Sequence, residues 1–420
     1  MARDISGYSC PFINQYVKIP KQISDRVNAD HPQEYEGVRH CLGLIIVNLL
    51  VQGEVAYSRN SNFYTEHRTE HYTRTNMWNA VDIAVDRGYA ARSLEGYKNP
   101  SFSRGLSSTL RPGPKLRGFK SPTELELDVE SLPLLSVDKR QVFDEDGLAY
   151  ILGHPRSVSP ESRNLLSNLP SLYGDALKLN RDYWNRMEID RHNLGPEARC
   201  MAGVGLTRDF SNGGVGRWFQ RGELSYQQLP EGERAKLLLN GEEVVELDYP
   251  AMHPHILYAW EGMQCPEGFY ERIADLCGCS RSVAKSIMLF AINAPSYTSL
   301  SSAVNLDKAK ETKANLGRSE PEPILYDELK RQGLEPRNVV GAISEAHPTI
   351  AKYIFSGSAI RLMLTESDIV TTALLRLMEL GIPALPVHDS LIVPKRHGGR
   401  VREVMEEAYR RHTGFSITVE

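Results

Sequence analysis

The chain has 420 residues, of which 41% are apolar and 24% charged, and its formal net charge is −4. These values are typical of a folded protein with two or three domains, and they exclude wholesale disorder and a globally basic nucleic-acid coat. The longest apolar run, 42–51, is far shorter than the ~20 residues that cross a bilayer. Six cysteines are too few for a disulfide scaffold. We therefore expect a cytoplasmic protein without membrane contacts.

The first third of the chain predicts a small module of helices followed by a hairpin. An apolar helix is expected over 36–51, and a second helix starts with Asn76 as its N-cap and stops near Gly88. Two short strands, 89–94 and 106–111, flank a loop that contains glycine, asparagine and proline. Two helices and a hairpin with a long loop are the layout of a winged helix.

The hairpin region is strongly basic, although the protein as a whole is acidic. Between 87 and 120 eight lysines and arginines stand against one acid, Glu95, which favours a surface that faces phosphates. The residues expected to bind DNA are Arg104, Arg111, Lys115 and Arg117. A solvated charged loop is the alternative interpretation.

The basic run ends near 120, where an acidic and apolar stretch begins. The following segment predicts an amphipathic helix around 173–191 and carries no legible chemistry. We expect a polar N-terminal arm at 1–34, a winged-helix-like module at 35–120, a connecting or thumb-like region at 121–200, and a catalytic domain at 201–420.

The C-terminal half contains two aspartates at predicted strand ends. Asp248 follows the short apolar strand 244–247 and precedes a helix whose first turn would hold Pro250; its alternative role is that of a helix N-cap. Asp389 lies at the apex of a predicted tight hairpin, in His388-Asp389-Ser390. Two such carboxylates can hold two divalent ions about 4 Å apart for phosphoryl transfer. Oxygen ligands suit Mg²⁺, and Mn²⁺ can take its place.

Between the two aspartates a helix is expected to begin after Ser280 as its N-cap. One face of it carries four residues at intervals of four: Arg281, Lys285, Leu289 and Asn293. Cations at this spacing can contact successive phosphates. A solvent-facing stripe of charges is the alternative.

In this order the three elements resemble motifs A, B and C of the family A DNA polymerases and the single-subunit phage-type RNA polymerases. Motif A corresponds to 248–253, with His253 where the DNA enzymes have glutamate. Motif B corresponds to 281–294, with Asn293-Ala294 where Tyr-Gly is usual. Motif C, 388–390, has the His-Asp-Ser form of the RNA enzymes. Flanking similarities are Gly216-Arg217-Trp218, Leu229-Pro230, a helix at 400–412 and a final strand at 415–420.

The resemblance implies an α+β fold, a right-hand polymerase with an antiparallel-sheet palm and compact helical fingers. It implies that Asp248, Asp389 and the backbone carbonyl of Tyr249 hold two magnesium ions, that Arg281 and Lys285 bind a nucleoside triphosphate, and that Arg217 and His388 lie at the primer end of a DNA primer-template. His253 and Asn293 would also contact the nucleotide. The helix 362–377, with Glu366-Ser367-Asp368, would line the template; a plain amphipathic core helix is the alternative.

The product is left open between DNA and RNA. A bulky His253 beneath the sugar favours deoxynucleotides, whereas Ser390 points towards ribonucleotides. The alternative functions are a single-subunit RNA polymerase or primase-like enzyme, a winged-helix replication initiator or regulator with an inactive polymerase-like domain, and a metal-dependent nuclease.

Overall fold

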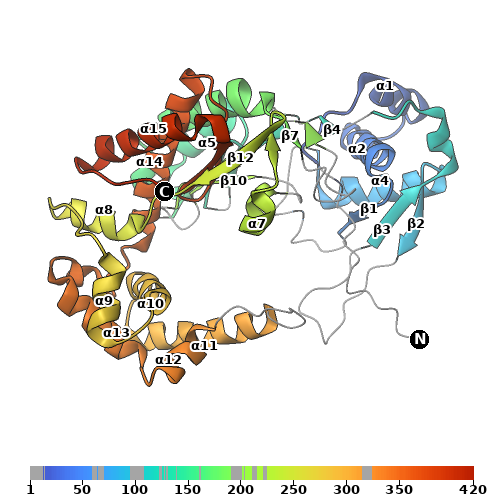
Figure 1. The fold of residues 1–420 in the computed structure, drawn as a ribbon. Coiled ribbons are helices and arrows are strands. Elements are labelled where there is room, and N and C mark those ends of the chain that lie inside the picture. The colour runs from blue at the N-terminus through green and yellow to red at the C-terminus, as the bar shows by residue number, and fades with distance from the viewer. Residues whose placement is uncertain are drawn as a thin grey trace, which may run out of the picture.

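The computed structural model describes residues 13, 15–58, 64, 71–94, 108–122, 125–126, 128, 131–138, 140–159, 162–190, 201–202, 204–210, 215–220, 225–314 and 324–420. They form two bodies with separate hydrophobic cores, the smaller within 13–125 and the larger within 134–419 (Figure 1). In this part of the chain, every helix is too short or too polar to span a membrane.

The N-terminal body packs helices against a three-stranded antiparallel sheet of order β1-β3-β2. Its elements are α1 (Lys21–Asp30), α2 (Glu36–Gln52), β1 (Val55–Tyr57), α4 (Arg74–Asp86), β2 (Ala90–Leu94) and β3 (Ser108–Pro112). Helix α2 packs against both α1 and α4 and is apolar nearly all round, which explains why it is the buried centre of this body. Its buried Asn48 donates to the carbonyl of Leu44 at 2.9 Å.

The predicted N-cap of the second helix is wrong by three residues. Thr73, in extended conformation, caps α4, and its hydroxyl accepts from the backbone N–H of Asn76 at 3.3 Å. A threonine in this place satisfies one of the amides that the first helical turn leaves unpaired, so the helix begins at Arg74 rather than after Asn76.

The next part of the chain adds a small four-stranded sheet of order β10-β9-β5-β6 and two helices. The elements as far as residue 220 are β4 (Leu125–Glu126), β5 (Leu135–Val137), β6 (Arg140–Val142), α5 (Glu145–Gly153), α6 (Leu169–Lys178), β7 (Ile189–Asp190), β8 (Met201–Ala202), β9 (Leu206–Phe210) and β10 (Arg217–Gln220).

The helix predicted over 173–191 starts before residue 173, at Leu169, and its α-helical part also ends earlier than predicted. Helix α6 ends at Lys178, and the chain widens into a π turn over Leu179–Tyr183. Buried Asn180 lies in this turn, where its side chain pairs with both backbone groups of Leu206 at 2.8 and 2.9 Å. This contact ties the turn to β9; the residues 191–200 lie outside the described part.

The largest sheet has five strands in the order β13-β14-β12-β11-β7 and is antiparallel throughout; it lies in the region expected to form a polymerase palm and is called the palm sheet, or palm, below. Its further elements are α7 (Glu231–Arg234), β11 (Leu238–Leu239), β12 (Glu242–Leu247), α8 (Met252–Trp260), α14 (Ala359–Glu379), β13 (Leu385–Val387), β14 (Ser390–Pro394) and α15 (Gly398–Thr413). Helix α15 packs against β12 and β14, and α14 packs against α15, α8 and β10.

A helical lobe is inserted between α8 and α14 and lies beside the palm (Figure 1). It comprises α9 (Phe269–Cys277), α10 (Arg281–Asn293), α11 (Tyr297–Ala314), α12 (Leu325–Arg331) and α13 (Pro336–Ala346). Buried His347 joins the lobe to the palm helix α8, because one ring nitrogen bonds the hydroxyl of Tyr258 and the other the carbonyl of Phe269, both at 2.9 Å.

Two further expectations about the palm need correction. Pro250 does not lie in the first turn of a helix, because Ala251 adopts a left-handed conformation with φ of 50° and α8 begins only at Met252. The segment 415–420 is not a strand. Its last residue, Glu420, instead exchanges two backbone hydrogen bonds with Asp248, at 3.0 and 3.1 Å, so only one pair of residues is joined in the manner of a sheet.

Candidate active site

The two predicted aspartates lie at the same edge of the palm sheet. Asp248 directly follows β12, and Asp389 is the second residue of the two-residue turn between β13 and β14. Strand β12 pairs with β14 so that Leu247 is opposite Leu391. This register brings the end of β12 next to the hairpin turn.

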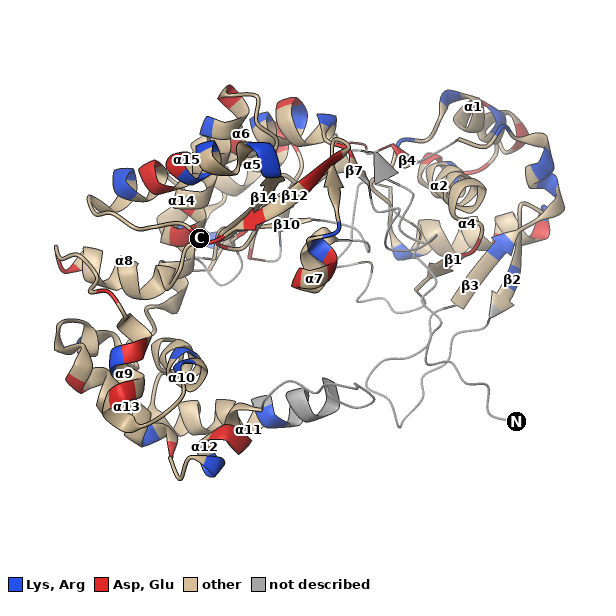
Figure 2. Ribbon diagram, viewed as in Figure 1, with Lys and Arg blue, Asp and Glu red and all other residues tan. Residues whose placement is uncertain are grey.

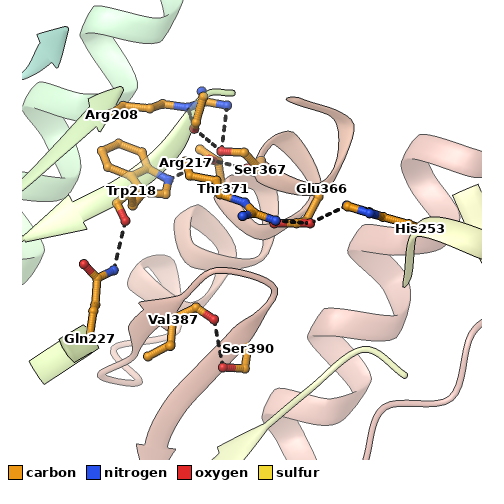
Figure 3. Close-up of polar contacts among 11 residues, drawn as sticks. Arg208, Arg217, Trp218, Gln227, His253, Glu366, Ser367, Thr371, Val387 and Ser390 are labelled. Carbon is orange, nitrogen blue, oxygen red and sulfur yellow. Dashed lines mark hydrogen bonds and ion pairs between the residues drawn. The ribbon is translucent and has the colours of Figure 1, made fainter. Parts of the chain in front are cut away.

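Each aspartate is preceded or followed by a non-glycine residue in a left-handed conformation. His388, directly before Asp389, has φ of 55°, and Ala251, three residues after Asp248, has φ of 50°. Side chains with a Cβ rarely adopt this conformation, although histidine does so more often than most. At the hairpin, the Ser390 hydroxyl donates to the carbonyl of Val387 at 2.9 Å and closes the turn (Figure 3).

Neither aspartate has an ion-pair partner among the described residues, and their pKa values rise. The surrounding protein displaces water from Asp389, and with the charges of Glu366 and Asp248 this raises its pKa to about 7. Asp248 is exposed, yet partial desolvation raises its pKa too. The N–H of Tyr249 and the charge of Lys285 act in the opposite direction and lower it. Two carboxylates that repel each other without a counter-ion favour a bound cation.

Two other carboxylates at this edge are each held by an arginine. Arg234 binds Glu246 through two nitrogens at 2.7 and 2.9 Å, and the Ser390 hydroxyl, whose single hydrogen is shared with the Val387 carbonyl, lies 2.6 Å from the same carboxylate. Arg217 binds Glu366 through two nitrogens at 2.7 and 2.8 Å (Figure 3). Glu246 and Glu366 are therefore each paired with an arginine, whereas the two strand-end aspartates have no ion-pair partner among the described residues.

Sequence reasoning assigned Glu366 to a helix lining the template and did not predict its contacts with Arg217 and His253. The expected helix is present as α14, and Glu366 on it is 1% exposed. Burial opposes its ionised form, yet hydrogen bonds from His253 and Arg217 keep its pKa below the ordinary value. The sequence did contain a sign that Glu366 is buried, because the helical spacing places it on the apolar face of α14 with buried Leu362, Ile369 and Ala373.

The two predicted histidines occupy different environments. The Nε2 atom of His253 lies 2.8 Å from the Glu366 carboxylate, and only 12% of its side chain is exposed. His388 is the first residue of the hairpin turn and is exposed, and its ring is in a T-shaped arrangement with that of Phe219 at 6.4 Å between centroids. Desolvation and the charge of Arg217 lower the pKa of His388.

Helix α10 presents the predicted face to solvent, because Arg281, Lys285, Leu289 and Asn293 are all exposed. The Ser280 hydroxyl accepts from the N–H of Val283 at 3.3 Å, which confirms the predicted N-cap. Lys285 lies within electrostatic range of Asp248, whereas Arg281 is paired with Glu271 at 2.6 Å.

The predicted DNA-binding cations of the N-terminal body differ in their exposure and in their contacts. Figure 2 shows Lys and Arg along β2, β3 and α10. Arg111 and Arg117 are exposed, and Arg104 lies outside the described residues. Lys115 faces inward instead: its Nζ atom lies 3.2 Å from Asp30 and 4.1 Å from the ring centre of Tyr89.

The donor atoms at the sheet edge fit a hard divalent cation. Within the described ranges no group of three or more His, Cys, Asp or Glu side chains converges as a complete metal cluster. Mg²⁺ does not require one, because it is commonly held by one or two carboxylates together with water and substrate phosphates. Asp248, Asp389 and the carbonyl of Tyr249 are the residues that would hold it.

Comparisons with known proteins do not assign the chain to a family. No model of a known protein family matches the sequence, and no curated protein matches it. Among solved structures, the POL domain of Pol1 from M. smegmatis, in complex with DNA primer-template and dNTP, is similar over 97% of this chain and 66% of that chain. The sequence identity is 12% and the TM-score 0.29, values that by themselves carry no conclusion.

Proposed function

We propose that the protein is a template-directed nucleotidyltransferase, specifically a compact DNA polymerase that adds dNTPs to a primer 3′ end with two Mg²⁺ ions. The observation that carries the proposal is that Asp248 and Asp389 lie next to each other at adjacent antiparallel strand ends, and that neither has an ion-pair partner among the described residues. Phosphoryl transfer needs positive charge on both the attacking and the leaving oxygen, and such a pair recruits it.

The remaining residues take roles that follow from their positions. Bound Mg²⁺ would supply Lewis-acid stabilisation of the transferring phosphoryl group. Lys285 would bind the triphosphate, with Arg281 joining it after leaving Glu271. Arg217 and His388 would orient the primer end, and Asn293 would contact the nucleotide from the far end of the same helix face.

The choice of sugar is assigned to His253. Its ring lies five residues after Asp248 in the first turn of α8 and retains a partly exposed edge. A ring at this place would leave no room for a 2′-hydroxyl, which supports dNTPs over NTPs. An RNA polymerase or primase-like enzyme is the alternative, and Ser390 in motif C is the observation that favours it.

We propose that the N-terminal body is a winged-helix-like module that holds nucleic acid through exposed Arg111 and Arg117. The order helix, strand, helix and hairpin, with a sheet of order β1-β3-β2, supports this proposal. The same module would serve a replication initiator whose palm is inactive, but an inactive palm has no need to keep both strand-end carboxylates uncompensated.

The deciding experiment is primer extension with the full chain, Mg²⁺, and dNTPs or NTPs on DNA and RNA templates. Asp248→Ala and Asp389→Ala should each lower incorporation by at least about a thousandfold, because each removes a metal ligand. Asp146→Ala, which removes an exposed carboxylate from the distant helix α5, is the matched control and should retain full activity.

Substantial turnover in either strand-end variant would exclude the two-metal assignment. Cleavage of the primer without extension would favour a nuclease, and DNA binding without any turnover of the native chain would favour the inactive initiator. Efficient extension with NTPs in preference to dNTPs would replace the DNA-polymerase proposal by the RNA-polymerase alternative.

A further inference from the structure

The buried carboxylate of Glu366 lies beside the candidate site and has no part in the proposed reaction. The Oε1 atom of Glu366 accepts from Arg217 Nε at 2.7 Å, and Oε2 accepts from Arg217 Nη2 and lies by His253 Nε2, both at 2.8 Å (Figure 3). Strand β10, helix α8 and helix α14 therefore meet at a single side chain.

These contacts fix the orientation of the His253 ring. A carboxylate that is 1% exposed is tolerated because its partners satisfy it, and losing one partner would leave buried charge uncompensated. Rotation of the ring away from Glu366 would break such a contact. The imidazole of His253 thus presents one fixed edge to the outside, and 12% of the side chain is exposed.

The group formed by Glu366, Arg217 and His253, called the clamp below, lies close to the proposed reaction centre without belonging to it. The charge of Glu366 acts on both Asp248 and Asp389, so the three carboxylates are within electrostatic range of one another. Both oxygens of Glu366 are nevertheless engaged by Arg217 and His253. Glu366 is therefore placed to hold its neighbours rather than to ligate a cation.

We propose that Glu366 is a positioning residue for nucleotide selection, which fixes His253 against the ribose edge of the incoming nucleotide and Arg217 beside the primer end. This inference rests on the proposed function and names the feature that would let the site take a deoxynucleoside triphosphate and reject its ribonucleotide counterpart. A mobile ring could move aside for a 2′-hydroxyl, whereas a ring held by a buried carboxylate cannot.

The test compares Glu366→Gln with Glu379→Gln. Glu379 lies on the same helix and pairs with exposed Arg376 at 2.8 Å, so the same exchange removes an arginine contact there but touches neither His253 nor Arg217. Glu366→Gln should lower the dNTP-to-NTP ratio of kcat/KM about tenfold or more, chiefly by improving KM for NTPs. Glu379→Gln should keep the native ratio. Melting temperatures of both variants show whether the fold is retained.

Double variants distinguish positioning through His253 from an independent effect. If Glu366 acts through the ring, His253→Ala and the combined His253→Ala/Glu366→Gln variant should have the same sugar ratio. Effects that multiply would overturn the inference. So would a native ratio in Glu366→Gln, or a native protein that does not prefer dNTPs.

Nucleotide binding separates this inference from the proposed function. Titration calorimetry with dATP and ATP, in Ca²⁺ instead of Mg²⁺, measures discrimination without turnover. If the native chain does not extend primers but binds dATP more tightly than ATP, and Glu366→Gln loses that difference, the polymerase proposal fails and the role of Glu366 stands. Equal discrimination by the native chain and Glu366→Gln overturns the role of Glu366 whether or not primers are extended.

Discussion

At the scale of single residues, the basic segment after α4 divides into cations that face solvent and one that does not. Lys115 is paired with Asp30 and lies over the ring of Tyr89, and this contact helps to lower the pKa of Asp30 to about 2 against the cost of desolvation. Arg117 is exposed. The two residues should therefore respond differently to the same substitution.

Lys115→Ala should lower the melting temperature of the N-terminal body, because it removes the cation above Tyr89 and one of the two cations paired with Asp30, the other being Arg26. Arg117→Ala should leave the melting temperature unchanged and weaken duplex DNA binding, with a log–log salt slope smaller by roughly 0.9 for each lost phosphate contact. Fluorescence anisotropy across a salt series and thermal melts provide the two measurements. If Arg117→Ala leaves the slope unchanged, this surface is only a solvated charged loop.

Residue patterns predicted the two strand-end aspartates because each follows a short apolar strand, and the pairing of β12 with β14 then brings them together. The same patterns could not predict the clamp on Glu366. Its partners Arg217 and His253 lie 149 and 113 residues away in the chain, and only the packing of β10, α8 and α14 brings them near. A buried glutamate on an apolar helix face was the one local sign.

At the scale of elements, α10 was predictable to the residue at its N-cap, because capping by Ser280 is decided within one turn. Other boundaries depended on distant contacts. The π turn after α6 depends on Asn180 pairing with Leu206, and the late start of α8 depends on the left-handed Ala251. Periodicity contains neither kind of information.

The exposed face of α10 leads to a prediction about its two cations. Lys285→Ala should lower kcat/KM for nucleotide incorporation by about a hundredfold, because it removes a cation whose charge acts on Asp248. Arg281→Ala should have a smaller effect, since Arg281 must first leave Glu271. Arg331→Ala on α12, which removes an exposed cation paired with Glu328, is the control. Equal losses in all three variants would mean that only the total charge of the lobe matters.

At the scale of the whole molecule, the two hydrophobic cores are separate within the described residues. The short parallel pairing of β4 with β8 links the two bodies. Composition and the end of the basic run predicted a boundary near 120, and the smaller core extends to Leu125. The boundary near 120 stays a prediction, which the sequence could make because a change in charge and hydropathy is a local property of the chain.

Two cores should unfold in two steps. Calorimetry of the full chain should resolve two transitions, and Mg²⁺ with a nucleotide should raise only the transition of the larger body, because ligands stabilise the body that binds them. Asp248→Ala should abolish this shift and leave the transition of the N-terminal body unchanged. A single transition with equal calorimetric and van't Hoff enthalpies would instead show that the bodies unfold as one unit.

The left-handed residues beside the two aspartates have a consequence for protein engineering. A side chain with a Cβ pays about 1–2 kcal/mol for this conformation, whereas glycine adopts it freely. Laboratory selection for heat resistance alone should therefore favour glycine at both Ala251 and His388. The first exchange removes a methyl group, but the second removes an imidazole from the apex of the hairpin. A library selected without an activity screen would accumulate variants with glycine at position 388, which resist heat better but have lost the imidazole and with it activity.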